Sequence, residues 1–546
     1  MTFKPSDAQQ RFYDWVTTEK GHCVLNAVAG AGKTTTILNG IEKMRGSVWF
    51  GVYNKKMADE IKEKVAGNAA LAKRAVFKAD EQITTSTFHS MGSGLVNSMT
   101  YPNKPTVDGK KVQNIVDQMI VRKEAEAQME RPDLHEIAGA VVQMVSMAKN
   151  RGFVQGALVK NGLTDWDDVT AWEEMVLHFD IGDTLEEDQT RTAISFARSV
   201  LRKSVADVTV IDFDDMVYLP LARRCNLKPW HKRDWVLIDE AQDTNPTRRA
   251  LAQKVLAPGG RLIAVGDPHQ AIYGFTGADN DSLDQIKVAF DAIELPLTTT
   301  YRCPKAVVAH AQQWVKHIEA HEDNVEGEVI QMPYGDLVGS IRQDTRKGLA
   351  ASEMAILCRY NKYLVGLCFK LIREGIAAKI EGRSIGDGLI KLATRWKSAK
   401  TVNGLETKLM QYREREMAKA EKKGQEQKME RIDDEVATLL VVVERVRTKG
   451  LDRVTDVVDA IEEIFDDNVS GGDLITLCSA HKSKGLEWDT VYLLDRQALM
   501  PSEFAKQDWQ IDQEVNLIYV AVTRAKETLI EVSGVVEEKN PLEGKV

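Results

Sequence analysis

Several marks of membrane, secreted and zinc-binding proteins are missing from this sequence. No run of roughly eighteen or more apolar residues occurs, so we expect no membrane-spanning helix. The N-terminal stretch MTFKPSDAQQRF has no apolar core of the kind that a signal peptide needs. The six cysteines form no Cys-x-x-Cys pair, which argues against both a zinc site and a disulfide framework. We therefore predict reduced, mostly buried thiols, no zinc and no membrane association.

A large excess of one charge is also missing. The 546 residues carry a formal net charge of −9, with both signs mixed along the chain, and 43% of them are hydrophobic. This length and composition predict a globular protein of several domains. The mild acidity does not exclude a nucleic-acid partner, because phosphates are neutralised by a local groove of Lys and Arg rather than by the total charge.

A phosphate-binding loop is predicted near the N-terminus. The stretch HCVLNAVAGAGKTTTILNGIEKM reads as a short apolar strand, a glycine-bearing turn and a helix, and it fits the Walker A spacing except that Ala27 replaces the first glycine. Lys33 is then expected to reach the β- and γ-phosphates, and Thr34 to hold Mg²⁺. The backbone N–H groups that would cradle the phosphates belong to Ala29, Gly30, Ala31, Gly32, Lys33, Thr34 and Thr35. A glycine turn that only caps a helix is the alternative.

A pair of carboxylates follows a second apolar run, in DWVLIDEAQDTNP. Asp239 is suited to bind Mg²⁺ through water, and Glu240 to polarise the water that attacks the γ-phosphate. The alternative, a surface acidic pair, fits less well because acids seldom end an apolar strand directly. With the phosphate loop, this pair predicts hydrolysis of ATP or GTP.

The stretch VGDPHQAIYGFTGA, residues 265–278, follows a third apolar run, RLIAV. A loop at the end of a buried strand is where α/β folds gather their ligands, so Gln270 is placed to sense the γ-phosphate. Tyr273 and Phe275 stand beside glycines, and exposed aromatic rings on such loops are suited to stack on unpaired bases. This loop is therefore predicted to contact the nucleotide at one end and a base at the other.

The ordered set of these motifs resembles a superfamily 1 DNA helicase of the UvrD/Rep/PcrA type. The motifs that carry the resemblance are PSDAQQ, NAVAGAGKTTT, VLIDEAQD, VGDPHQAIYGFTGA, LTTTYRCP, CSAHKSKGLEWDTV and NLIYVAVTRAKETL. They span positions 9 to 528, almost the whole chain. AHKSKGLEW and DFDDM also resemble, more weakly, the F-box DNA helicase branch.

The resemblance implies further contacts to ATP. It makes Gln9 the reader of adenine and places Tyr301 in a stack on the base, with Glu487 at the ribose. Arg302 and Arg524 would reach the γ-phosphate as arginine fingers. Gln242 would help to couple hydrolysis to movement. Ordinary surface cations are the alternative interpretation of the two arginines.

The resemblance also implies a track for DNA. The family's base-stacking aromatic falls at Val52, so Tyr53 is expected to substitute for it. The other DNA contacts implied are Asn54, Lys55, Thr87, His89, Ser479 and His481, in addition to Tyr273 and Phe275. A core histidine is the alternative for His89.

The predicted fold is α/β, with two RecA-like P-loop lobes, each a mostly parallel sheet interrupted by a largely helical insertion. We predict strands of the second lobe at MAILCR, TVYLLD and LIEVSGV, and long solvated helices in residues 408–450. The expected divisions are 1–97 with 205–297 for the first lobe, 98–204 for its insertion, 298–384 with 471–546 for the second lobe, and 385–470 for its reduced insertion. A helical spacer and a DNA-contacting arm remain open for the last segment.

The activity implied is ATP- and Mg²⁺-dependent movement along single-stranded DNA, 3′→5′ by resemblance, in replication, recombination or repair. The expected partners are single-stranded DNA, single-strand/duplex junctions and proteins of recombination or replication, and the motor is expected to be monomeric. It would lie in the cytoplasm with the nucleoid, or wherever DNA is replicated. Two alternatives stay open: a translocase that displaces recombinase or other proteins with little unwinding, and a nucleotide-gated DNA-binding module without motor activity.

Overall fold

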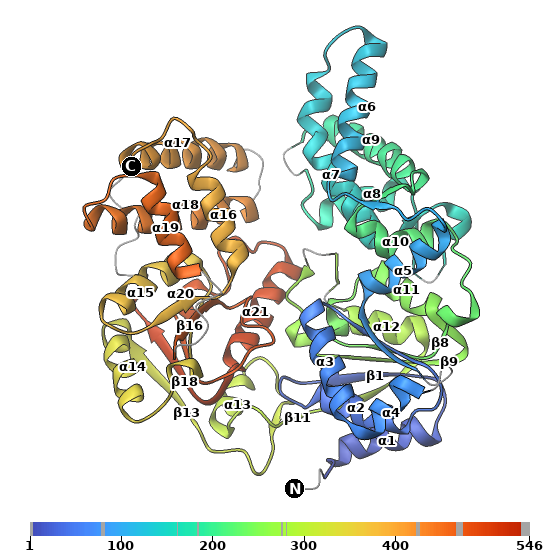
Figure 1. Ribbon diagram of the computed structural model, residues 1–546, viewed down its shortest axis with the longest axis horizontal. Coiled ribbons are helices and arrows are strands. Elements are labelled where there is room, and N and C mark those ends of the chain that lie inside the picture. Colours follow the sequence, from blue (N-terminus) through green and yellow to red (C-terminus); the bar gives the residue numbers. More distant parts are fainter. Residues whose placement is uncertain are drawn as a thin grey trace. The chain divides into compact units, whose positions relative to one another are not determined.

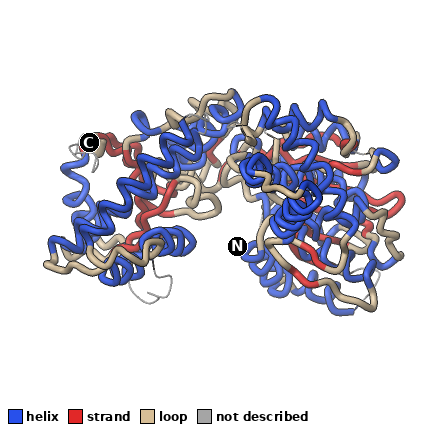
Figure 2. Tube along the Cα trace, turned by 90° about the horizontal axis from the view of Figure 1, so that it is seen from above, coloured by secondary structure: helices blue, strands red, loops and turns tan. Residues whose placement is uncertain are grey.

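The computed structural model describes residues 4–77, 82–160, 162–182, 185–274, 277–279, 281–421, 426–465 and 473–536. The chain divides into two compact units, one formed by Met1–Val28 with Gly32–Leu297 and the other by Ala29–Ala31 with Thr298–Val546. In each unit the strands of a six-stranded sheet lie among helices (Figure 1, Figure 2). None of the described helices is long and apolar enough to cross a membrane. All six cysteines are free and buried.

Every strand pairing in the sheet of the first unit is parallel, in the order β10-β1-β9-β8-β2-β3. Strands of a parallel sheet are covered on both faces and are therefore apolar throughout, as the buried VWFGV of β2 and VLI of β8 are. Their carboxyl ends meet at one edge, where ligands of open α/β sheets bind. The strands are β1 (His22–Ala27), β2 (Val48–Val52), β3 (Ile83–Thr87), β8 (Arg233–Ile238), β9 (Leu256–Gly266) and β10 (Ala292–Leu297).

Helices alternate with these strands, as the predicted βα units require. They are α1 (Asp7–Thr18), α2 (Lys33–Lys43), α3 (Lys55–Gly67), α4 (Ala69–Phe77), α11 (Pro246–Val255) and α12 (Ser282–Phe290). Local capping sets several of their starts. Ser6 caps α1 in a reciprocal box with Gln9, and Asn54 caps α3 through its side-chain oxygen.

The chain between β3 and β8 is mostly helical and has its own hydrophobic core. Its helices are α5 (Phe88–Thr100), α6 (Lys111–Ala127), α7 (Pro132–Arg151), α8 (Val169–His178), α9 (Glu187–Ala206) and α10 (Phe213–Ala222). Buried side chains of this core occur from Val96 to Ala222, and Trp172 and Val200 are completely buried in it. This core extends somewhat beyond the expected insertion 98–204, whose limits stay a prediction.

A cluster of buried charges joins three of these helices. Lys111 Nζ lies 2.6 Å from Asp215 Oδ2, and Lys149 Nζ lies 2.5 Å from Asp212 Oδ2 and 2.8 Å from Asp215 Oδ1. All four residues are buried, with two positive and two negative charges in balance. Removing one member would leave a buried charge without a partner, which is costly. The acidic stretch IDFDDM therefore anchors α6 and α7 to the start of α10.

The sheet of the second unit is also parallel at every pairing, in the order β13-β18-β17-β14-β16-β15. The three strands predicted at MAILCR, TVYLLD and LIEVSGV are confirmed as β14, β17 and β18. The strands are β13 (Glu328–Pro333), β14 (Met354–Cys358), β15 (Ala378–Ile380), β16 (Ile475–Ser479), β17 (Trp488–Leu494) and β18 (Ala525–Ser533). A separate short pair joins β11 (Thr299–Thr300) to β12 (Glu319–Ala320). The predicted fold class, α/β with two parallel-sheet lobes, is confirmed.

Helices of the second unit include the long pair predicted in residues 408–450. They are α13 (Lys305–Ala311), α14 (Leu337–Arg346), α15 (Asn361–Arg373), α16 (Arg383–Ala393), α17 (Val402–Glu421), α18 (Glu426–Thr448), α19 (Val454–Phe465), α20 (Arg496–Leu499) and α21 (Asp508–Val522). The prediction that both long helices are solvated was wrong for α18. Its residues Val436, Leu440 and Val443 follow helical spacing and are almost completely buried, because α18 packs against α15 and α17.

Candidate nucleotide and nucleic-acid sites

The phosphate loop connects β1 to α2, as its sequence predicts. Gly30 and Gly32 both have φ near +71°, a left-handed conformation that side-chain-bearing residues rarely adopt. Gly32 is the N-cap of α2, so Lys33 and Thr34 open the helix at its positive end. Lys33 and Thr34 are partly buried and Thr35 is exposed. The loop thus has the backbone shape and the helix start that an anion site requires.

Gln9 lies beside the first turns of α2. Its side-chain amide donates to Thr36 Oγ1 at 3.0 Å and accepts the Ser6 N–H at 3.0 Å, and only 3% of the residue is exposed. The amide therefore ties the start of α1 to the helix that follows the phosphate loop. Its predicted role as the reader of adenine stays a prediction.

The two carboxylates after β8 have different surroundings. Asp239 is 5% exposed, while Glu240 is less buried and has φ of 49°, a left-handed conformation that turns the chain sharply after the strand. Burial, together with the adjacent negative charge of Glu240, raises the pKa of Asp239 to about 7, and the nearby positive charge of Lys33 opposes this rise. The fold thus brings the lysine of the phosphate loop and the acid of β8 within electrostatic reach of each other, although they are separated by about two hundred residues in sequence.

A chain of hydrogen bonds leads from Glu240 to the loop after β9. Gln242 Nε2 donates to Glu240 Oε2 at 2.5 Å, and Gln242 Oε1 accepts the Asp267 N–H at 3.1 Å. Asp267 Oδ2 in turn accepts from Gln270 Nε2 at 2.7 Å. A side chain at Gly266 would collide with Gln242, so the glycine is what lets the two loops approach. Hydrogen bonds to the Gln242 side chain and to the backbone N–H and carboxylate of Asp267 therefore link Glu240 to Gln270.

Two aromatic rings from different loops lie nearly parallel to each other. The rings of Tyr53, after β2, and Tyr273, after β9, have centroids 5.8 Å apart and an interplanar angle of 9°. The guanidinium carbon of Arg248 lies 4.8 Å from the centroid of the Tyr53 ring. Arg248 also donates to the Asp243 carbonyl at 3.2 Å, which ties the stack to the segment after Glu240. Phe275, the second aromatic predicted in this loop, lies outside the described residues.

The remaining predicted DNA contacts of this unit occupy the ends of β2 and β3. Asn54 accepts the Met57 N–H at 2.9 Å and Thr87 accepts the Ser90 N–H at 3.1 Å, so both side chains cap helices. Lys55 is exposed at the start of α3. Burial and the charge of Arg248 lower the pKa of His89 to about 4, so its ring is neutral at pH 7.

In the second unit the predicted arginine fingers have different partners. Arg302 follows β11, and its Nε lies 2.5 Å from Glu487 Oε2, so the predicted γ-phosphate and ribose residues form an ion pair with each other. Arg524 is 1% exposed at the end of α21 and donates to the carbonyls of Val520, at 2.7 Å, and Leu486, at 3.2 Å. Both arginines therefore contact the same segment, because Arg302 pairs with Glu487 and Arg524 donates to the carbonyl of the preceding residue, Leu486.

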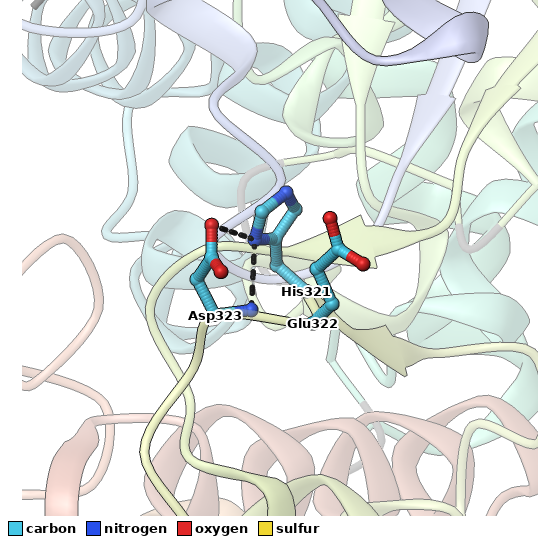
Figure 3. Close-up of side chains that lie close together, drawn as sticks. All are labelled: His321, Glu322 and Asp323. Atoms are coloured by element: carbon cyan, nitrogen blue, oxygen red, sulfur yellow. Dashed lines mark hydrogen bonds and ion pairs between the residues drawn. The ribbon is translucent and has the colours of Figure 1, made fainter.

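Tyr301, the predicted adenine platform, has a ring neighbour that the sequence did not reveal. It is 40% exposed, and its ring lies 4.8 Å from that of His321, tilted by 35°. Figure 3 shows His321 with Glu322 and Asp323. A ring nitrogen of His321 and a carboxylate oxygen from each of the two acids, atoms of the kind that can bind a metal ion, lie within 4.8 Å of one another. The ring nitrogen Nδ1 of His321 accepts the Asp323 N–H at 3.3 Å, so this turn holds the histidine through its own backbone. His321 therefore supports one side of Tyr301.

The last two predicted DNA contacts lie at the carboxyl end of β16 and just after it. Ser479 is 8% exposed at the end of the strand, and His481 stands two residues further on, in the turn that leads to β17. Burial, and then the charges of Arg359 and Lys482, lower the pKa of His481 to about 3. A neutral ring can contact a phosphate only as a hydrogen-bond partner and adds no positive charge.

Comparison with known proteins places the chain in a family. Residues 8–291 match the UvrD/REP helicase N-terminal domain, and residues 390–533 match the UvrD-like helicase C-terminal domain. The chain belongs to the UvrD/Rep helicase family. The predicted family resemblance is thereby confirmed.

Several relatives within the UvrD/Rep family bear functional names. The chain is 24% identical to F-box DNA helicase 1 of Gallus gallus over 94% of this chain and 47% of that protein. It is 21% identical to the ATP-dependent DNA helicase Rep of Buchnera aphidicola subsp. Acyrthosiphon pisum, over 94% of this chain and 93% of that protein. The chain spans about half the length of several other relatives.

Sequence reasoning did not single out three residues that the structure places beside the candidate site residues: Arg248, Asp267 and His321. Arg248 is the third residue of α11 and belongs to no recognised motif. Asp267 lies in the stretch VGDPHQAIYGFTGA, where the sequence assigned a role to Gln270 but none to Asp267. His321 lies twenty residues beyond Tyr301, in a stretch with no pattern. Only Asp267 had a usable signal, because an acid directly after a buried strand end is uncommon.

Proposed function

We propose that this protein is an ATP-dependent DNA helicase that moves along single-stranded DNA in the 3′→5′ direction. The observation that carries the proposal is the hydrogen-bonded path from Glu240 through Gln242 and Asp267 to Gln270, three residues before the stacked ring of Tyr273. A change at the γ-phosphate can shift this loop, and with it an aromatic platform for a base. The direction of movement rests on the family resemblance.

Mg²⁺ suits the oxygen donors of the proposed nucleotide site. The Thr34 hydroxyl and the Asp239 carboxylate are hard ligands of the kind that Mg²⁺ prefers. Asp239 is 5% exposed and lies beside Glu240, so a divalent cation would compensate two adjacent negative charges there. When bound with ATP, the ion would neutralise charge on the β- and γ-phosphates. Lys33 and the backbone N–H groups of the loop would bind the same phosphates, and Glu240 would take the proton of the attacking water.

The proposed step along DNA uses both units. By the family resemblance, Arg302 and Arg524 would contact the γ-phosphate, so that hydrolysis would change the interactions they make with the nucleotide. If the two units hold single-stranded DNA with different strength before and after hydrolysis, each cycle of ATP moves the protein along the strand. This inference depends on the family resemblance and on the contacts of both arginines with the segment Leu486–Glu487.

The decisive test uses three partial duplexes, with a 3′ tail, a 5′ tail and no tail, in the presence of ATP and Mg²⁺. Unwinding of the 3′-tailed duplex alone, abolished by Lys33→Ala, is the expected result. Unwinding of only the 5′-tailed duplex would contradict the proposed direction. Absence of unwinding with DNA-stimulated ATP hydrolysis would identify a translocase that displaces proteins, and hydrolysis without DNA stimulation would contradict the motor itself.

Replacing Tyr53 by alanine is expected to weaken binding of single-stranded DNA by about 1–3 kcal/mol, or roughly 5- to 150-fold in Kd, because one base-stacking surface is lost. Fluorescence anisotropy with a labelled oligothymidine measures this change. Tyr53→Phe is the matched control, since it keeps the ring and should bind with nearly the wild-type Kd. Equal weakening by both variants would assign the effect to the hydroxyl or to folding, and not to stacking.

A further inference from the structure

A polar cavity lies in the first unit, away from the candidate nucleotide site. It has a volume of about 630 Å³ and is lined by Ala157, Leu158, Lys160 and Leu163, by residues at the end of α10 and before β8, and by residues of α11. Its cationic lining residues are Lys160, Arg224, Lys232 and Lys254. None of its described lining residues carries a carboxylate. The cavity thus concentrates positive charge in a protein whose net charge is negative.

The cavity lies at the opposite edge of the sheet from the phosphate loop. Lys232 directly precedes β8 and Lys254 stands two residues before β9, so both lie near the amino ends of these strands. Asp239 and Gln270 follow the carboxyl ends of the same strands. Six residues of strand span about 20 Å, so the cavity and the nucleotide site are separate.

The positive charges of the cavity are not paired with carboxylates of the residues that the structure describes. None of the four cations forms an ion pair with a described residue. Lys232 Nζ donates instead to the carbonyls of Lys254, at 2.7 Å, and Leu256, at 3.1 Å, and Arg224 donates to the Ala157 carbonyl at 2.9 Å. These contacts hold two of the cations in place and leave their charge unbalanced.

Electrostatics agree with this arrangement. Burial, and secondarily the charge of Lys160, lowers the pKa of Lys232. Burial also lowers the pKa of Lys254, and Lys160 and Lys232 lower it further, while Cys225 opposes the change. An anion in the cavity would relieve the repulsion among these groups.

Besides the cations, the lining combines leucine side chains with the amides of Asn226 and Gln253. Leu158, Leu163, Leu221 and Leu227 contribute side chains to it. A pocket of about 300–1,000 Å³ with an apolar lining and a few converging polar groups is typical of sites for small molecules. The four cations line one cavity, whereas a site for a continuous nucleic-acid strand places its cations along a groove.

We propose that this cavity binds a compact ligand of nucleotide size that carries more than one phosphate group, with its apolar body against the leucines. Several phosphates match four cations, whereas a single carboxylate would leave most of the charge unbalanced. The site is independent of the proposed motor activity, because it shares no residue with the nucleotide or DNA sites.

Inorganic tripolyphosphate is the probe, titrated calorimetrically into the full chain carrying Lys33→Ala, which weakens the phosphate loop as a competing site. Adding Lys160→Gln and Lys254→Gln is expected to weaken tripolyphosphate binding about tenfold or more, because two charged donors are lost. Lys123→Gln with Lys203→Gln is the matched control, since these two exposed lysines of the same unit undergo the same change of charge. The control pair should bind like the parent chain.

Unchanged binding in the Lys160→Gln, Lys254→Gln chain, or equal weakening in the control pair, would overturn the proposal. If the double variant does not fold, Lys160→Gln alone keeps the test valid, because Lys160 is exposed. This single change should weaken tripolyphosphate binding by several-fold. A parallel titration with a 5′-phosphorylated oligothymidine separates the two sources of phosphate. Loss of oligothymidine binding without loss of tripolyphosphate binding would also overturn the proposal, since the cavity would then be a DNA contact.

Discussion

Replacing Glu240 by glutamine is expected to lower kcat for ATP hydrolysis by about 10²–10⁴-fold, the usual contribution of a general base. The amide keeps the size of the side chain and can still accept the hydrogen bond from Gln242 Nε2. Lys33 and the phosphate loop are unchanged, so ATP affinity should remain close to that of the wild type. Steady-state hydrolysis with saturating single-stranded DNA measures kcat, and a fluorescent ATP analogue measures binding.

Glu130→Gln provides the matched control for this variant, because Glu130 is an exposed glutamate of the same unit. The control should hydrolyse ATP at the wild-type rate. If Glu240→Gln also retained the wild-type kcat, Glu240 would not be the base, and Asp239 would be the next candidate. If it lost ATP binding together with kcat, the carboxylate would act in holding the nucleotide rather than in activating water.

Replacing Arg302 by alanine should lower kcat by about 10³–10⁵-fold, the range found for arginine fingers in other phosphoryl-transfer systems. Arg302 is a good position for this test because its side chain is 21% exposed and, among described carboxylates, pairs with Glu487 at 2.5 Å. Arg524 is nearly completely buried and donates to backbone carbonyls, so its loss would disturb folding as well. The measurement is kcat and KM for ATP with saturating single-stranded DNA.

Glu487→Gln separates two explanations for the loss at Arg302. It removes the negative partner and leaves the arginine in place, so kcat should change little, while KM should rise if Glu487 contacts the ribose. An equal fall of kcat in Arg302→Ala and Glu487→Gln would mean that the ion pair matters through structure. Arg302→Lys should recover only part of the rate, because an ammonium cannot reproduce the planar guanidinium.

Local patterns predicted the phosphate loop and the carboxylate pair because chemistry and backbone geometry coincide there within a few residues. The glycines at 30 and 32 adopt the left-handed conformation, and Asp239 directly follows a buried strand. The parallel sheets were predictable for the same reason, since apolar runs separated by helices require crossover connections.

Contacts between distant segments were not predictable in this way. Arg248 reaches Tyr53 and His321 reaches Tyr301 only because the tertiary structure brings separate loops together. The burial of α18 was missed because its charges suggested a solvated helix, whereas one face carries valine and leucine that pack on neighbouring helices.

The sequence by itself determined the family, the fold class and the residues expected around the nucleotide, because each of these depends on motifs of neighbouring residues. Only the tertiary structure decided which of those residues touch. It linked Glu240 to Gln270 through Gln242 and Asp267, and it gathered Lys160 and Lys254 in one cavity. The physical reason is that hydrogen bonds and charge interactions act over a few ångströms in space, and sequence spacing does not report such distances between segments that the fold alone brings together.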